Sequence, residues 1–159
     1  MSTARTLARK ATAIADLDSG LVLARVEIAV PPARVFTALT TDELTQWWGA
    51  PEMYRTTAHA IDLRVGGAWR SSGVGADGHT FHVGGEVLAV EAPHTLVYTW
   101  KPSWDDGPAT TVSYRLDAIP GGTRVTVRHT GFTNPAVCGD HATGWERVFG
   151  WLGDHLAAD

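Results

Sequence analysis

The side chains with the greatest capacity for ligand chemistry in this sequence are its aromatic rings. The 159 residues include seven tryptophans, three tyrosines and four phenylalanines, so half of the aromatic residues are tryptophan. Large rings on facing elements can leave a cavity between them, and ligand cavities are mostly apolar and aromatic with a few polar anchors. Trp N–H and Tyr O–H groups can serve as such anchors. The alternative is that the same rings fill a solid core.

We favour the cavity and predict that it holds an apolar or aromatic small molecule. Tyr98 and Trp100 share one face of a predicted strand, and Trp145 and Phe149 share one stripe of a predicted helix. The predicted ligand-binding residues are Trp48, Trp69, Phe81, Tyr98, Trp100, Tyr114, His129, His141, Trp145 and Phe149.

Proton-transfer chemistry is a second possibility for the same cavity. His129 ends a predicted strand and His141 opens the last helix, so both lie near one junction of sheet and helix. With Tyr98 and Tyr114 they are the candidate general acids or bases. We favour the alternative, in which each of these residues makes a structural hydrogen bond and moves no proton. Cys138 lies near a helix N-terminus, which can lower a thiol pKa, but we expect an inert, partly buried thiol.

Common catalytic and cofactor motifs give no support for other chemistry. The segment 73–78 matches G-x-G-x-x-G, but a strand follows it where a phosphate site needs a helix, so we interpret it as a mobile hairpin loop. His79 and His82 are three apart on a strand and point to opposite faces, so they cannot share a metal ion without a bulge. The G-x-S-x-G, H-E-x-x-H and C-x-x-C signatures do not occur. We therefore expect no metal and no cofactor.

The elements that must position these residues follow from periodicity. Alternating residues predict a strand over 21–30, and two short helices follow, at 32–39 and between Thr41 and Gly49, before a loop over 50–58. The remaining strands are predicted at 59–65, 68–72, 79–90, 95–100, 110–119 and 123–129. Helical spacing predicts one long amphipathic helix over 139–156. The predicted fold is α+β: a curved antiparallel sheet of six to seven strands wrapped around a long C-terminal helix.

The length and charge of the chain limit its expected domain organisation and partners. The chain fits one domain, 20–158, after an N-terminal tail, 1–19. The formal net charge is −4 and no basic run exceeds two residues, which argues against nucleic acid or an anionic membrane as partner. One cysteine and no long apolar run favour a cytoplasmic protein. We expect a monomer or a homodimer.

A series of short motifs, in order, resembles a known family. The opening strand leads into Ala29-Val30-Pro31-Pro32-Ala33-Arg34-Val35-Phe36, and Leu44-Thr45-Gln46-Trp47-Trp48 follows. The later pieces are Asp62-Leu63-Arg64-Val65-Gly66-Gly67-Ala68-Trp69, Gly85-Glu86-Val87, Leu96-Val97-Tyr98-Thr99-Trp100, His129-Thr130-Gly131-Phe132 and His141-Ala142-Thr143-Gly144-Trp145. Over about residues 21–156 the chain resembles the START-like (SRPBCC) helix-grip domains. It is most similar to the group named after the activator of the heat-shock-protein-90 ATPase.

The resemblance implies a cavity between sheet and helix that holds an apolar molecule, but no single activity. The leading hypothesis is a small-molecule binding protein, with antibiotic sequestration or self-resistance as a special case. The alternative is a polyketide aromatase/cyclase. A co-chaperone that activates an ATPase is the least expected, because the activator has a separate N-terminal domain where only a short segment precedes this one. The matched motifs are mostly structural, so no catalytic residue is carried over.

Overall fold

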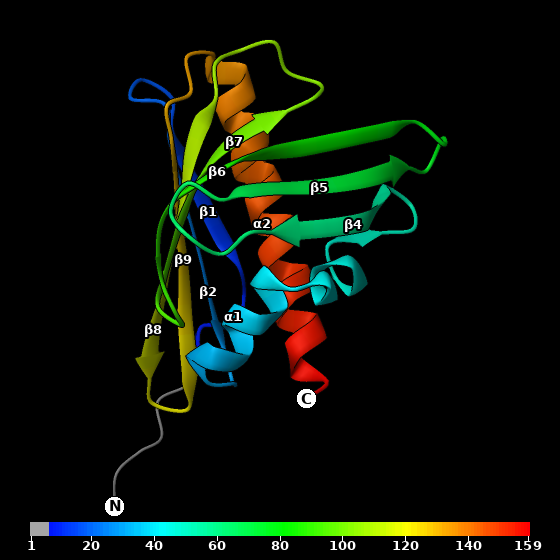
Figure 1. Ribbon diagram of the computed structural model, residues 1–159. Coiled ribbons are helices and arrows are strands. Elements are labelled where there is room, and N and C mark those ends of the chain that lie inside the picture. The colour runs from blue at the N-terminus through cyan, green and yellow to red at the C-terminus, as the bar shows by residue number, and fades with distance from the viewer. Residues whose placement is uncertain (1–6) are drawn as a thin grey trace, which may run out of the picture.

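The computed structural model describes residues 7–159 as one antiparallel sheet with two α-helices and a short 3-10 helix (Figure 1). The sheet order is β1-β2-β9-β8-β7-β6-β5-β4-β3. The strands are β1 (Thr12–Asp16), β2 (Leu21–Ile28), β3 (Gly49–Ala50), β4 (Tyr54–Ile61), β5 (Ala68–Gly75), β6 (Thr80–Glu91), β7 (Thr95–Pro102), β8 (Thr110–Ile119) and β9 (Gly122–Thr130). The helices are α1 (Pro32–Thr40), η1 (Asp42–Gln46) and α2 (Pro135–Ala157). The α+β sheet-and-helix architecture is confirmed, but the sheet has nine strands and not six or seven.

The two additional strands lie at the edges of the sheet, where sequence patterns are weakest. β1 falls inside the segment predicted as a loose tail and pairs with β2, with Ile14 opposite Leu23. Its partly buried side chains are alanines, whereas Ile14 is 67% exposed, so no apolar alternation marks it. β3 has only two residues, paired with the start of β4. Residues 1–6 of the predicted tail lie outside the described residues.

Several predicted boundaries also move. β4 ends at Ile61 and not at residue 65, and β5 continues to Gly75, into the segment predicted as a loop over 73–78. β4 begins at Tyr54, inside the region predicted as a loop over 50–58. α2 begins at Pro135 and not at residue 139, because the Asn134 side chain accepts hydrogen bonds from the backbone N–H groups of Ala136 and Val137. Proline at the first helical position needs no N–H partner. The Asn-Pro pair was therefore a helix-start signal in the sequence.

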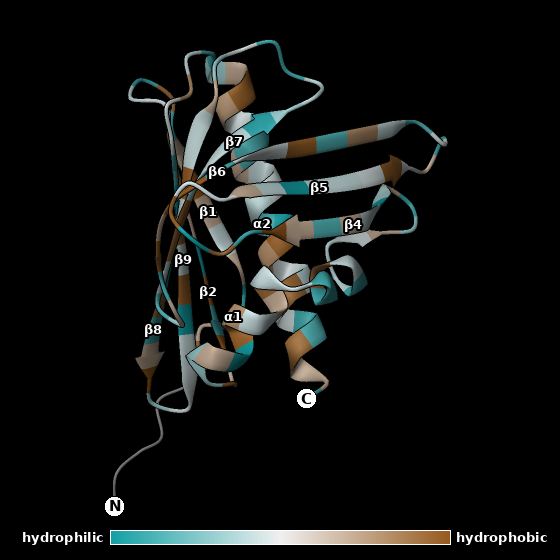
Figure 2. Cartoon of the chain, viewed as in Figure 1, coloured by the Kyte–Doolittle hydropathy of each residue, from teal (hydrophilic) through white to brown (hydrophobic). Residues whose placement is uncertain are grey.

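The bent sheet holds α2 close on one side only. In Figure 1, β4 and β5 run across α2, whereas β2, β8 and β9 run along it. The backbone of α2 comes closest to β1 and β2, and the β4–β7 half stands farther away. Phe149 and Leu152 of α2 are fully buried, as are Val22 and Val127 of the sheet. Brown and teal segments alternate along α2 in Figure 2, as expected for a helix with one buried side. Among residues 7–159, no helix has the length and apolarity needed to cross a bilayer.

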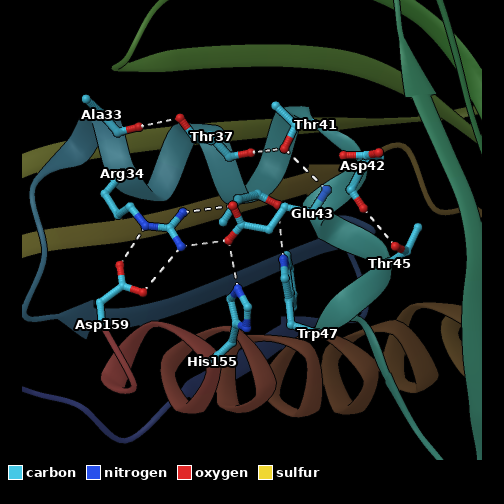
Figure 3. Close-up of polar contacts among 11 residues, drawn as sticks. Ala33, Arg34, Thr37, Thr41, Asp42, Glu43, Thr45, Trp47, His155 and Asp159 are labelled. Carbon is cyan, nitrogen blue, oxygen red and sulfur yellow. Dashed lines mark hydrogen bonds and ion pairs between the residues drawn. The ribbon is translucent and has the colours of Figure 1, made fainter.

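A charged cluster fastens the last turn of α2 to α1 and η1 (Figure 3). The Arg34 guanidinium donates to both carboxylate oxygens of Glu43, at 3.0 and 2.8 Å, and its Nε donates to Asp159 at 2.6 Å. His155 Nε2 lies 2.7 Å from Glu43 Oε2. The hydrogen bonds from Arg34 hold the pKa of Glu43 below its usual value, although burial opposes this shift. Such a bidentate pair fixes geometry, so η1 is held at a set position beside α2.

A substitution at Gly85 can test the close packing of β6 against β7. A Cβ at this position would lie 2.1 Å from the backbone oxygen of Thr99, the same oxygen that accepts the indole N–H of Trp69. We expect Gly85→Ala to destabilise the protein by roughly 1–3 kcal/mol through overpacking. Gly150→Ala is the control, because no atom lies within 4 Å of a Cβ there and alanine favours a helix by up to about 1 kcal/mol. Urea denaturation measures both, and equal stability of the two variants would contradict the packing described.

Candidate functional site

A cavity of about 420 Å³ lies between α2 and the half of the sheet that stands away from it. This volume is in the range of small-molecule sites, about 300–1,000 Å³. Its aromatic lining consists of Trp48, Tyr54, Trp69, Phe81, Tyr98, Trp100, Trp104 and Trp145. Its polar lining consists of Thr56, His59, Ser71, Ser72, His79, Asp140 and His141, and the rest is Leu44, Val83, Gly144 and Val148.

The structure brings seven of the ten residues predicted to bind ligand to the cavity wall. These are Trp48, Trp69, Phe81, Tyr98, Trp100, His141 and Trp145. Tyr114, His129 and Phe149 are buried and belong to the solid core. The Trp145 ring contacts these three at centroid distances of 5.8, 6.0 and 5.7 Å, respectively, while it also lines the cavity. They therefore support the wall from behind.

Of the twelve lining residues that the sequence analysis missed, five come from β4 and β5 and three from α2. Tyr54 and Thr56 were placed in a loop, although they alternate with Arg55 and Thr57 in a strand-like pattern. A β-bulge between Thr56 and Ala58 then disturbs the alternation, so no simple period marks the inward side chains of this strand. Nor did any sequence pattern mark Trp104, which is 57% exposed at the cavity mouth and contacts Phe81 edge to face.

Most indole N–H groups of the lining hold the walls together, so those hydrogens are not free to anchor a ligand. Four of the five tryptophans in the lining donate to protein acceptors at 2.8 to 3.3 Å. The pairs are Trp48 to the Tyr54 hydroxyl, Trp69 to the Thr99 backbone oxygen, Trp100 to His141 Nε2 and Trp145 to His129 Nδ1. The cavity therefore presents the faces and edges of rings in fixed positions.

His129 is a structural histidine in a buried chain of hydrogen bonds. Its Nδ1 accepts from Trp145, so the proton of the neutral ring is on Nε2, which donates to the Thr110 hydroxyl at 2.6 Å. Burial lowers the pKa of His129 to about 2, with a smaller contribution from His141. At neutral pH the ring is uncharged and both nitrogens are occupied, so His129 is poorly suited to move a proton for a ligand.

The other candidate acid and base groups are also engaged. His141 Nδ1 donates to the Val137 backbone oxygen at 2.9 Å, while its Nε2 accepts from Trp100. Burial raises the pKa values of Tyr98 and Tyr114 above the usual tyrosine range, and the two hydroxyls are hydrogen-bonded to each other. Burial also raises the pKa of Cys138, with Asp16 adding to the shift, so the helix N-terminus does not activate this thiol.

The glycine-rich segment is part of a hairpin that borders the cavity. Gly73 and Gly75 belong to β5, and Gly78, with φ +87°, forms the turn before β6. A Cβ on Gly73 would lie 2.4 Å from the Phe81 ring, so this glycine makes room for a cavity-lining side chain. Within residues 7–159, no three His, Cys, Asp or Glu side chains come together in a way that could hold a metal ion.

Comparison with known proteins agrees with this architecture. Residues 29–157 match the family described as Activator of Hsp90 ATPase homolog 1-like protein. The chain belongs to this family. The resemblance inferred from the sequence motifs is thereby confirmed.

Solved structures share the fold across most of the chain. AHSA1 from Silicibacter pomeroyi is 29% identical with a TM-score of 0.75, covering 87% of this chain and 98% of its own. A protein from Rhodobacter sphaeroides is 24% identical with a TM-score of 0.79, covering 94% and 99%. CalU16 from Micromonospora echinospora is 21% identical with a TM-score of 0.67, covering 98% and 86%. No curated protein sequence matches the chain.

The depressed pKa of His129 predicts a loss of stability in acid. Below about pH 6.5 the unfolded chain binds a proton at this residue and the folded chain does not, so unfolding becomes easier as the pH falls. The expected loss from His129 at about pH 5 is about 2 kcal/mol relative to neutral pH. His129→Asn, whose amide oxygen can accept from Trp145, should be less stable at neutral pH but lose less on acidification. Urea denaturation at both pH values measures this, and parallel pH profiles would contradict it.

Proposed function

We propose that this protein binds an apolar, aromatic small molecule in the cavity between α2 and strands β4 to β7. The observation that supports the proposal is the wall of eight aromatic rings around a volume of about 420 Å³. Neighbouring rings meet at angles from stacked, as for Trp69 and Tyr98 at 4.3 Å, to edge-on, as for Tyr54 and Phe81 at 5.4 Å. Such a wall offers flat faces to planar ligand rings, which bind aromatic surfaces favourably.

The charge of the lining narrows the ligand class. The lining includes the carboxylate of Asp140 and neither lysine nor arginine. An anionic ligand would lose its hydration on entering the cavity without gaining an ion pair, which costs free energy. The proposed ligand is therefore neutral or weakly cationic, with most of its surface apolar.

Two narrower roles are possible for such a cavity. One is sequestration of a flat polycyclic or polyketide-like compound, including an antibiotic against which the cell protects itself. The other is aromatase/cyclase catalysis on a polyketide. The first is favoured, because the hydrogen bonds described for His129, His141, Tyr98 and Tyr114 leave these groups poorly placed for proton transfer.

Gly144 on α2 gives a direct test of the proposed cavity. It lines the cavity, and no atom lies within 4 Å of a Cβ placed on it. We expect Gly144→Phe to occupy the site and weaken binding of the neutral fluorescent probe N-phenyl-1-naphthylamine by about tenfold or more. Gly150→Phe is the matched control, because Gly150 is on the same helix with equal space but outside the lining.

Fluorescence titration measures both affinities, and circular dichroism checks that both variants are folded. Wild-type protein that does not bind the probe, or two variants that bind it equally well, would overturn the proposal. Native mass spectrometry of freshly purified protein then searches for a ligand that co-purifies. We expect any bound mass to be absent from Gly144→Phe and present in Gly150→Phe.

A further inference from the structure

Trp104 is an exception among the tryptophans of the cavity lining. The other four donate their indole N–H groups to protein acceptors, whereas no residue in 7–159 accepts a hydrogen bond from Trp104. Its side chain is 57% exposed, although tryptophan rings are highly buried on average. The ring nevertheless lines the cavity and meets Phe81, another lining residue, edge to face at 5.5 Å. Trp104 therefore leaves a large apolar surface exposed to water at the edge of the cavity.

The exposed side chains of the lining show where the cavity opens. Among the lining residues in the described part of the chain, His79, Trp104 and Asp140 are exposed, and the others are buried or partly buried. We call these three residues the mouth of the cavity. Trp69 and Trp145 are buried and belong to its inner wall. A ligand that fills the cavity therefore extends from the buried rings to the mouth.

The segment that carries Trp104 is held by hydrogen bonds on both sides of this residue. Ser103 makes two hydrogen bonds with the backbone of His82 on β6: its N–H donates at 2.8 Å, and its Oγ accepts at 3.1 Å. The Lys101 ammonium donates to two backbone oxygens that follow Trp104 in the chain. None of residues 103–109 is buried, so these bonds do not serve to place a side chain in the core. They hold the backbone of Trp104 at the mouth, so little backbone freedom is lost when the ring contacts a ligand.

We infer that Trp104 is the outer wall of the ligand site, where its ring packs on the end of the ligand that reaches the mouth. This inference rests on the proposed function and narrows the ligand to an extended planar molecule that contacts the buried rings and Trp104 at once. Covering the exposed ring with an aromatic ligand is favourable, because apolar surface of both is removed from water. A ligand is favoured over a partner protein as the group that covers the ring, because Trp104 lines the cavity together with Phe81.

Two ligands of different length distinguish the outer wall from the inner wall. Naphthalene is N-phenyl-1-naphthylamine without the anilino group, so it can bind the buried rings and leave the mouth empty. Trp104→Ala should weaken binding of N-phenyl-1-naphthylamine about tenfold and binding of naphthalene by less than about threefold. Trp104→Phe retains a ring, so both affinities should stay within about threefold of the wild-type values. Fluorescence titration of the probe and its displacement by naphthalene measure these affinities.

Leu88→Ala is the matched control, because Leu88 is an exposed apolar residue on β6 outside the cavity lining. It should leave both affinities unchanged. Equal losses for the two ligands in Trp104→Ala, or no loss for either, would overturn the role of Trp104 and leave the proposed cavity intact. Wild-type protein that binds neither ligand would overturn the proposed function together with this inference.

The indole N–H of Trp104 reports on the same contact in the wild-type protein. The seven tryptophans should give seven indole signals in a ¹H–¹⁵N spectrum, and the Trp104 signal is the one missing from Trp104→Phe. N-phenyl-1-naphthylamine should shift this signal and slow its exchange with water, and naphthalene should do neither. An unchanged Trp104 signal at saturation would overturn the inference. So would a signal that is protected in the free protein and loses its protection on dilution, because a second copy of the chain then covers the ring.

Discussion

The hydrogen bond from Trp145 to His129 decides which part of this domain is solid and which part is open. The indole N–H of Trp145 meets His129 Nδ1 at 2.9 Å in the buried core, and His129 continues to Thr110 on the neighbouring strand. This chain fixes the Trp145 ring between the core and the cavity. Trp48 packs on its open side at 5.8 Å and Trp100 at 6.0 Å, so the orientation of the wall depends on one buried histidine remaining neutral.

The small side chains of one strand in the sheet are a second cause of the cavity. The backbone of α2 approaches β1 and β2, so the β4–β7 half must be filled by side chains or left empty. After Trp69, the next two inward positions of β5 are the small residues Ser71 and Gly73. Phe81 occupies the space that Gly73 leaves, whereas Ser71 borders the open cavity. The cavity therefore arises where small residues of β5 lie opposite α2, because their side chains are too short to reach the helix.

The hydrogen-bonded walls are consistent with the proposed binding role. The indole N–H groups of Trp48, Trp69, Trp100 and Trp145 are used within the protein, and the Arg34 cluster fastens η1 beside the end of α2. A ligand that enters a preorganised aromatic site loses its own freedom but does not have to order the site, which saves conformational entropy.

The sheet-and-helix architecture could be predicted from the sequence, because alternation in residues such as Val22 to Ile28 and helical spacing from Trp145 to Leu156 are local periodic signals. The sequence also indicated the aromatic wall, since ring pairs such as Tyr98 and Trp100 share a face by the geometry of a strand. The depth at which each ring lies depends on packing between distant elements, so it could not be predicted. Tyr114 and Phe149 show the same sequence pattern as lining residues but lie behind Trp145. The residues near them in the sequence do not indicate that another part of the chain covers them. β1 and the position of His59 could not be predicted either. The inward residues of β1 are alanines, so this edge strand has little apolar contrast. The bulge in β4 reverses the faces of the residues that follow it, and His59 is one of them.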